Sequence, residues 1–208
     1  SHQEVSYVDW LPNLTDDMGY QSILITSDMG WSSEIFYFNY GTQVQSDQYG
    51  VVLGDFESSS YRISGGYGFG FNDWLVGARL NLYSHNFIDD YSIDMNYGFD
   101  IGAYKEFGNT SLGLVLKDVG GETEFLSQKL NLPMSVGVGV GHKFGNFTLA
   151  SDVKFYEDYN SIGLGGQYDL GIASLKLGYY TESEFDVDYI TLGGSIDAGI
   201  VDLSLAYY

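Results

Sequence analysis

The sequence predicts an all-β protein: a single antiparallel up-and-down transmembrane β-barrel of about 14 strands, within a range of roughly 12 to 14. Two observations favour this fold. Apolar residues recur at every second position along much of the chain, which is the period of a strand and not of a helix. Glycine contributes 28 of the 208 residues, and aromatic residues contribute 17%. Glycine inside these segments disfavours helices, whereas aromatic residues suit strands.

The clearest alternation lies in the segments 75–83, 111–117, 134–143 and 147–156. In the third of these, Val136, Val138 and Val140 alternate with glycine. Each segment therefore has one bulky apolar face and one small or polar face, as expected for a strand with two different environments.

Short and long connections separate the predicted strands. The short ones are turn-like and fall at 72–73, 108–109, 145–146 and 169–172. The longer polar ones fall at 42–49, 85–90, 119–132 and 181–188. From residue 72 onward the two kinds alternate, which is typical of an outer-membrane barrel with short turns at one end. No linker interrupts the chain, so residues 1–208 are expected to form one barrel domain.

The composition excludes several classes of protein. Eight Lys and Arg against 28 Asp and Glu give a net charge of −20, so binding to nucleic acid through phosphate neutralisation is not expected. Cysteine is absent, which excludes disulfides and thiolate metal sites. Charged residues make up only 17%, below the roughly 25% of soluble domains. The bacterial outer membrane is the expected location.

The face opposite the aliphatic residues carries glycine and a few charges, which suits a crowded barrel interior better than a solvated surface. We expect these side chains either to bias permeation or to pair across strands. The candidate lumen residues are Arg79, Lys117, Asp152, Lys154, Lys176, Tyr83 and Tyr156.

Aromatic residues near the ends of predicted strands are expected to form the girdles that contact outer-membrane lipid at the two interfaces. The main candidates are Trp10, Trp31, Trp74, Phe144, Tyr179 and Tyr207, and Tyr20 and Tyr40 belong to the same expectation.

Residues that could support chemistry are few. His2, His85 and His142 are the only histidines, and their positions give little support to a Ser–His–Asp site. The acidic runs, such as 182–188, lack the spacing of a calcium loop and are interpreted as solubilising charge. We therefore expect no enzyme activity, no metal site and no cofactor.

Several segments together resemble the FadL-related, PorV/PorQ-like family of outer-membrane proteins. They are residues 5–12 (VSYVDWLP), 65–71 (GGYGFGF), 112–120 (LGLVLKDVG), the Leu132–Pro133 pair, and 203–207 (LSLAY). The family's N-terminal Gly-Met-Gly and Asn-Pro-Ala-Gly elements are not in this sequence. Tyr208 is one step out of phase with Leu203, Leu205 and Tyr207, unlike the usual final aromatic residue of such barrels.

Three functions stay open. Resemblance to FadL implies the passage or binding of small, including hydrophobic, ligands through the barrel, which the glycine- and tyrosine-lined face also favours. Resemblance to PorV implies a scaffold or shuttle with a secretion-system partner, which fits the long acidic loops. A soluble acidic secreted β-domain, such as an adhesin, is the third hypothesis.

Overall fold

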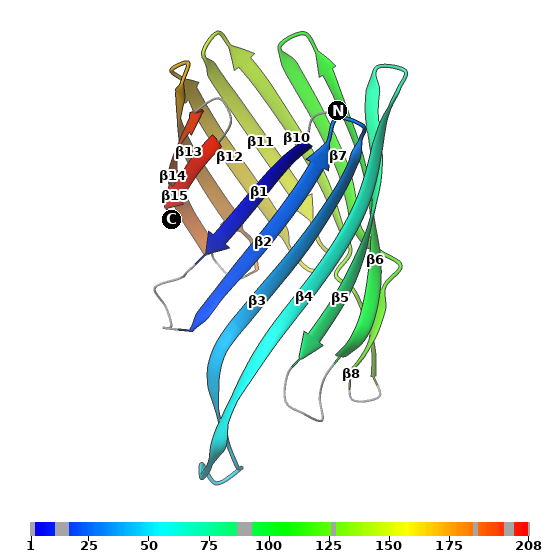
Figure 1. Cartoon of the computed structure of the whole chain (residues 1–208), viewed down its shortest axis with the longest axis vertical. Helices are drawn as coiled ribbons and strands as arrows, with labels where there is room; N and C mark the ends of the chain where they lie inside the picture. The colour runs from blue at the N-terminus through cyan, green and yellow to red at the C-terminus, as the bar shows by residue number, and fades with distance from the viewer. Residues whose placement is uncertain are drawn as a thin grey trace. The chain divides into compact units, whose positions relative to one another are not determined.

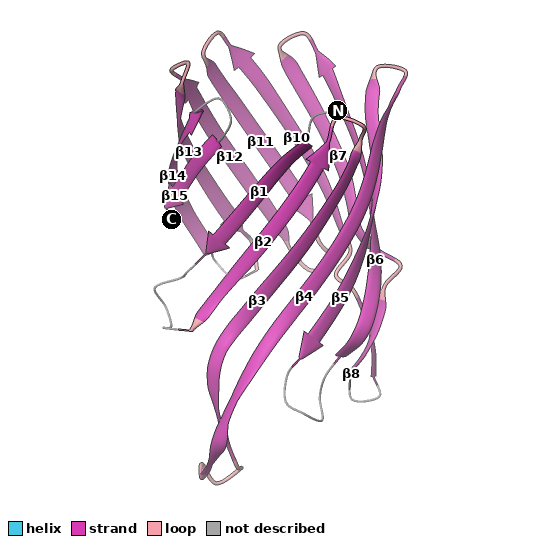
Figure 2. Ribbon diagram, viewed as in Figure 1, coloured by secondary structure: helices cyan, strands magenta, loops and turns pink. Residues whose placement is uncertain are grey.

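The computed structural model describes residues 3–10, 17–86, 93–125, 128–184, 187–197 and 202–207, which consist of strands joined by turns and loops (Figure 2). Within these ranges no helix is long and apolar enough to cross a membrane. The strands are β1 (Gln3–Trp10), β2 (Met18–Ser27), β3 (Trp31–Ser46), β4 (Val52–Phe71), β5 (Trp74–Asn86), β6 (Ile93–Phe107), β7 (Thr110–Val119), β8 (Glu122–Phe125), β9 (Gln128–Asn131), β10 (Ser135–Phe144), β11 (Phe147–Phe155), β12 (Asn160–Asp169), β13 (Ala173–Glu182), β14 (Val187–Asp197) and β15 (Asp202–Tyr207).

Thirteen of these strands form one sheet in which each strand pairs with the next along the chain, except that β7 pairs with β10 (Figure 1). The two short strands β8 and β9 pair only with each other. This up-and-down order needs only local connections, and thirteen strands lie within the predicted range.

The chain divides into two compact units, each described by itself below. Unit 1 comprises Ser1–Phe69, Gly77–Ile101 and Asp118–Leu132. Unit 2 comprises Gly70–Val76, Gly102–Lys117 and Pro133–Tyr208. That residues 1–208 make one domain therefore stays a prediction.

The predicted short turns are confirmed. Asn72 and Asp73 both have positive φ, 47° and 65°, as a two-residue type I′ hairpin turn requires. Gly108 and Gly145 each open a two-residue turn with φ of 61°. These turns have the backbone twist that antiparallel neighbours need.

Replacing Asp73 with glycine is expected to stabilise the protein by about 1 kcal/mol, because glycine adopts positive φ without the Cβ clash of an L-residue. The urea midpoint of the folded, heat-modifiable band on a gel measures this change. Gly108→Ala should shift the midpoint in the opposite direction. An unchanged midpoint for Asp73→Gly would contradict the assignment of the turn.

Two of the predicted long connections contain strands. The prediction of a loop at 42–49 is wrong, because β3 and β4 continue as a two-stranded hairpin to a turn at Asp47–Gly50. We call residues 42–57 the hairpin extension. Alternation of Gln43, Val44 and Gln45 accounts for it. Likewise, 119–132 contains the β8–β9 hairpin, whereas residues 87–90 of the predicted loop 85–90 lie outside the described part.

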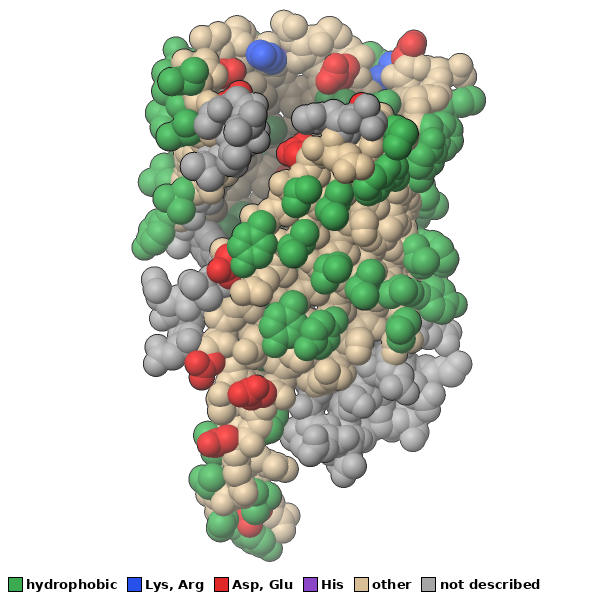
Figure 3. Space-filling model, viewed as in Figure 1, with side chains coloured by type: hydrophobic (Ala, Val, Ile, Leu, Met, Phe, Trp, Pro, Cys, Tyr) green, Lys and Arg blue, Asp and Glu red, His purple; other side chains and the backbone are tan. Residues whose placement is uncertain are grey.

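The burial pattern is the reverse of a soluble core. No hydrophobic side chain is buried in the described part of the chain, and the buried polar residues there are serines and asparagines. On neighbouring strands of unit 1, Ile23, Ile35 and Ile63 are paired and exposed. Figure 3 shows apolar side chains spread over this outer face of β1–β5. Soluble proteins bury such residues, so this face is suited to hydrocarbon.

Unit 2 has the same two faces. Val138 and Leu114 pair on its exposed apolar face, and Gly137 is buried on the other. Lys176 departs from the expectation of an enclosed polar face, because its side chain is exposed although it lies on the same face as buried Ser174, two residues earlier. Its cross-strand neighbours are Gln167 and Gly193, and glycine offers no side chain to cover a long lysine.

Candidate functional site

The register of β2, β3 and β4 places an unusual set of side chains on the polar face of unit 1. Ser22 pairs with Phe36, which pairs with Arg62. Because side chains alternate along each strand, Glu34 lies on the same face two residues before Phe36. This face therefore combines bulky aromatic rings with ionised groups.

Four aromatic residues form a row on this face, which we call the aromatic row: Tyr20, Phe36, Phe38 and Tyr40. The ring centroids of Tyr20 and Phe36 are 5.3 Å apart, and those of Phe38 and Tyr40 are 4.6 Å apart. Tyr20 also stacks on Phe38 at 6.4 Å. All four side chains are partly exposed, so their rings remain accessible.

Glu34 is the centre of an ion cluster at one end of the aromatic row. Its Oε2 accepts hydrogen bonds from Nη2 of Arg62 at 3.1 Å and of Arg79 at 2.5 Å. Its Oε1 accepts a hydrogen bond from the Ser22 hydroxyl at 2.9 Å. The Arg62 guanidinium also lies 5.0 Å from the centroid of the Phe36 ring, within the range of a cation–π contact. Two cations and one carboxylate give this cluster a formal charge of +1.

Two sets of hydrogen-bonded polar residues lie beside the ion cluster. Ser60 donates to the Tyr40 hydroxyl at 3.0 Å and lies 2.6 Å from Nδ1 of His85. The Tyr83 hydroxyl donates to Asp118, whose backbone N–H donates to Asp100 at 3.0 Å. These contacts link polar side chains on five strands, β3 to β7, and hold the polar face in one arrangement.

The structure places the predicted lumen residues in different surroundings. Arg79 and Tyr83 belong to the contacts just described in unit 1. In unit 2, Asp152 and Lys154 are partly buried on β11, whereas Lys117 and Lys176 are exposed. Gly163 faces Asp152 and leaves room for its carboxylate.

Tyr156 lies just beyond β11 and stacks on Tyr159 with centroids 4.2 Å apart. Burial and the neighbouring Tyr156 raise the pKa of the Tyr159 phenol above its ordinary value. The lumen roles of all seven candidates stay predictions.

Most of the predicted girdle residues lie at strand ends. Trp31 and Trp74 begin β3 and β5, and Phe144 and Tyr207 end β10 and β15 with exposed rings. Nζ of Lys105 lies 5.6 Å from the Trp74 ring centroid, a contact suited to a membrane–water interface.

Tyr179 is exposed three residues before the end of β13. The side chain of Trp10, at the end of β1, is outside the described part. The prediction that Tyr20 and Tyr40 belong to the lipid-facing girdles needs correction, because both side chains contribute to the aromatic row and not to the apolar face.

The sequence analysis missed Glu34, Arg62, Phe36 and Phe38. The alternation of side chains along a strand places Arg62 on the face opposite to that of Tyr61 and Ile63. This pattern could have identified Arg62 as a residue of the polar face. Residues 35–40 (IFYFNY) are bulky at almost every position, so alternation alone does not separate their faces.

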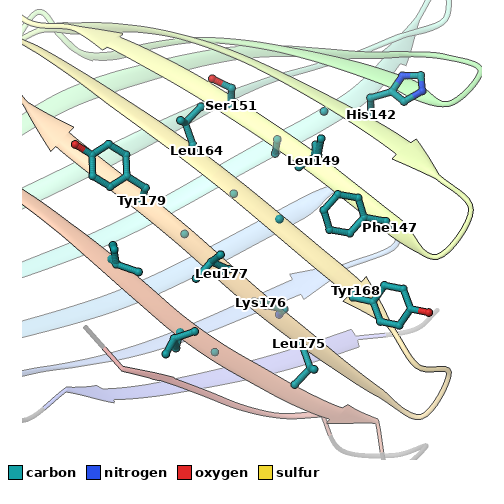
Figure 4. Close-up of a pocket in the computed structure, with 18 of the residues that line it drawn as sticks. His142, Phe147, Leu149, Ser151, Leu164, Tyr168, Leu175, Lys176, Leu177 and Tyr179 are labelled. Atoms are coloured by element: carbon teal, nitrogen blue, oxygen red, sulfur yellow. The ribbon is translucent and has the colours of Figure 1, made fainter.

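A hollow of about 950 Å³ lies on the exposed apolar face of unit 2, over β10–β14 (Figure 4). Its walls include Phe147, Leu149, Leu164, Tyr168, Leu177 and Tyr179. Gly166 leaves space between Leu149 and Leu177, its paired neighbours on the two flanking strands. Because this hollow is on the face of the exposed aliphatic residues, it is separate from the polar face. No group of three or more His, Asp or Glu residues within the described ranges is arranged to hold a metal ion.

No family model and no curated protein matches the sequence. The fold is similar to solved structures of outer-membrane proteins. The toluene transporter TodX of Pseudomonas putida has a TM-score of 0.60 and 13% identity, over 99% of this chain and 80% of that one. A TodX deltaS2S3 mutant, described as a monoaromatic hydrocarbon channel, has a TM-score of 0.66 and 13% identity over 91% and 76%. The KdgM porin has a TM-score of 0.51 and 12% identity over 92% and 95%.

These likenesses confirm the predicted fold class, an antiparallel up-and-down β-barrel of the outer-membrane type. They also support the FadL-related part of the resemblance at the level of fold. The structures that the chain resembles are those of transporters and porins rather than enzymes.

Proposed function

We propose that the chain is a non-enzymatic channel of the bacterial outer membrane that binds and passes small hydrophobic molecules. The observation that carries this proposal is the aromatic row on the polar face of unit 1. Barrel interiors are normally polar, so four rings in contact there provide a surface on which an apolar molecule can be held. The likeness to a toluene transporter supports the same class of ligand.

In this proposal the exposed apolar side chains of each unit contact outer-membrane lipid, and acyl chains fill the hollow over β10–β14. Transfer of these side chains from water into hydrocarbon supplies the driving force for insertion.

Uptake of radiolabelled toluene by intact Gram-negative cells tests the proposal. Cells that carry the protein in their outer membrane are expected to take up toluene faster than cells without it. The double variant Phe36→Ser/Phe38→Ser should reduce the added uptake about tenfold, since each lost ring contact contributes about 0.5–1.5 kcal/mol. Ile23→Ser/Ile35→Ser, on the opposite face, is the matched control. Uptake is expressed per amount of folded, heat-modifiable protein, because these two side chains face lipid in this proposal. Equal uptake with and without the protein would exclude the channel.

A second candidate function is a scaffold or shuttle with a secretion-system partner, which the PorV/PorQ-like resemblance supports. The hairpin extension favours it, because Tyr49, Val52 and Leu53 are exposed there beyond the last β2–β3 pair, Met18 with Tyr40. The Asp47 carboxylate accepts hydrogen bonds from the backbone of Tyr49 and Val51, both at 2.9 Å, and so fixes the tip. A pull-down from native membranes that yields the same partner with the wild type and with Tyr49→Ser/Leu53→Ser would exclude this role for the tip.

A further inference from the structure

We propose that the preferred ligand is a small monoanion with a planar apolar ring, an aromatic carboxylate, which is bound between the aromatic row and the Glu34 ion cluster. The proposal deepens the channel function proposed above and rests on it. It identifies the charged end of the ligand as well as its apolar body.

The first argument is the charge of the cluster. Arg62 and Arg79 donate to the same oxygen of Glu34, so one carboxylate serves two guanidinium groups. One positive charge is left without a compensating carboxylate in this cluster, although the whole chain has a net charge of −20. A ligand with one negative charge would neutralise the cluster.

The second argument is the supply of hydrogen-bond donors. The Nε–H groups of Arg62 and Arg79 are buried and have no hydrogen-bond partner in the part of the chain that the structure describes. The two side chains are nevertheless 31% and 30% exposed, so part of each remains accessible from solvent. A carboxylate is the acceptor that matches Nε and Nη of one guanidinium, because it can accept both bonds at once. Binding would then provide partners for donors that have already lost water.

The third argument is the distance between the cluster and the rings. Glu34 and Phe36 lie two residues apart on one strand, about 6.6 Å along the chain. Arg62 lies over the Phe36 ring itself. A single aromatic ring in contact with the accessible part of Phe36 can therefore reach the guanidinium groups with a carboxylate attached directly to the ring.

The fourth argument limits the ligand to one negative charge. The next ionised groups of this face are Asp100 and Asp118, which are held together through Tyr83 and the backbone. Their negative charge repels any anion on this face, so a ligand with two negative charges is disfavoured more strongly than a monoanion. At the other end of the row, Ser60 and His85 offer neutral polar groups.

Equilibrium dialysis of the full chain in detergent micelles tests this inference with three probes: benzoate, benzyl alcohol and acetate. Binding to empty micelles is subtracted. Benzoate is expected to bind about tenfold more tightly than benzyl alcohol, and acetate more weakly than both. Arg62→Gln and Arg79→Gln should each weaken benzoate binding about tenfold and leave benzyl alcohol within about twofold. Lys105→Gln, which removes a cation from another face, should change neither.

Equal binding of benzoate and benzyl alcohol to the wild type would overturn the inference, and so would acetate competing as well as benzoate. If an arginine variant does not migrate as a folded, heat-modifiable band, Phe36→Leu decides the matter, because it keeps both arginines. Phe36→Leu should weaken benzoate and benzyl alcohol alike, and unchanged benzoate binding would overturn the inference. Toluene uptake by cells remains the separate test of the channel, so the two proposals can fail independently.

Discussion

Replacing Glu34 with glutamine is expected to lower the free energy of unfolding by about 2–4 kcal/mol. Glu34 is the partner of both Arg62 and Arg79, so the change leaves two guanidinium groups facing each other on one face. An unpaired charge that has lost water costs several kcal/mol, and the partial exposure of the arginines reduces that cost. The hydroxyl of Ser22 also loses its charged acceptor. The urea midpoint of the folded band in lipid vesicles measures the change.

Glu57→Gln is the matched control, because Glu57 is exposed on the hairpin extension, and it should change stability by no more than about 0.5 kcal/mol. A second comparison separates lost pairing from lost packing. Replacing Glu34, Arg62 and Arg79 together by leucine or methionine should recover most of the stability that Glu34→Gln loses. If the triple variant were less stable than Glu34→Gln, the ion cluster would be a net source of stability and our explanation would be wrong.

The strands that the sequence predicted well are those in which the two faces have different residue sizes. Val136, Val138 and Val140 alternate with glycine, and β10 has the predicted faces with Gly137 buried and the valines exposed. The same contrast is absent from β3, where Ile35, Phe36, Tyr37 and Phe38 are bulky on both sides. Alternation is a signal only when the two environments select different side chains.

The candidate site depends on the pairing register of β2, β3 and β4, which cannot be read from the sequence. Arg79 was predicted for the interior from its place in the alternation of β5, but its partner Glu34 lies 45 residues earlier in the chain. Their contact passes over β4 and requires the pairing of Glu34 with Ser64, a small residue that leaves room for it. A shift of one residue would move Glu34 to the opposite face. The pair therefore follows from the sheet as a whole and not from either segment.

Replacing Leu177 with arginine is expected to destabilise the protein by about 2–4 kcal/mol, because Leu177 is central on β13 and would face the bilayer in the proposed outer-membrane channel. The Leu177 side chain is 56% exposed and that of Leu53, on the hairpin extension, is 62% exposed. If both side chains are exposed to water, the two positions should tolerate arginine equally well. If Leu177 is exposed to hydrocarbon and Leu53 to water, only Leu177 should not tolerate arginine.

Leu53→Arg is therefore the matched control, and it should change stability by no more than about 0.5 kcal/mol. Urea titrations of both variants in lipid vesicles provide the measurement. The ratio of the two effects tests the environment of the apolar face directly, because the substitution and the exposed fraction are nearly the same. Two small and equal effects would favour the remaining hypothesis of a soluble acidic β-domain, since water tolerates arginine at any exposed position.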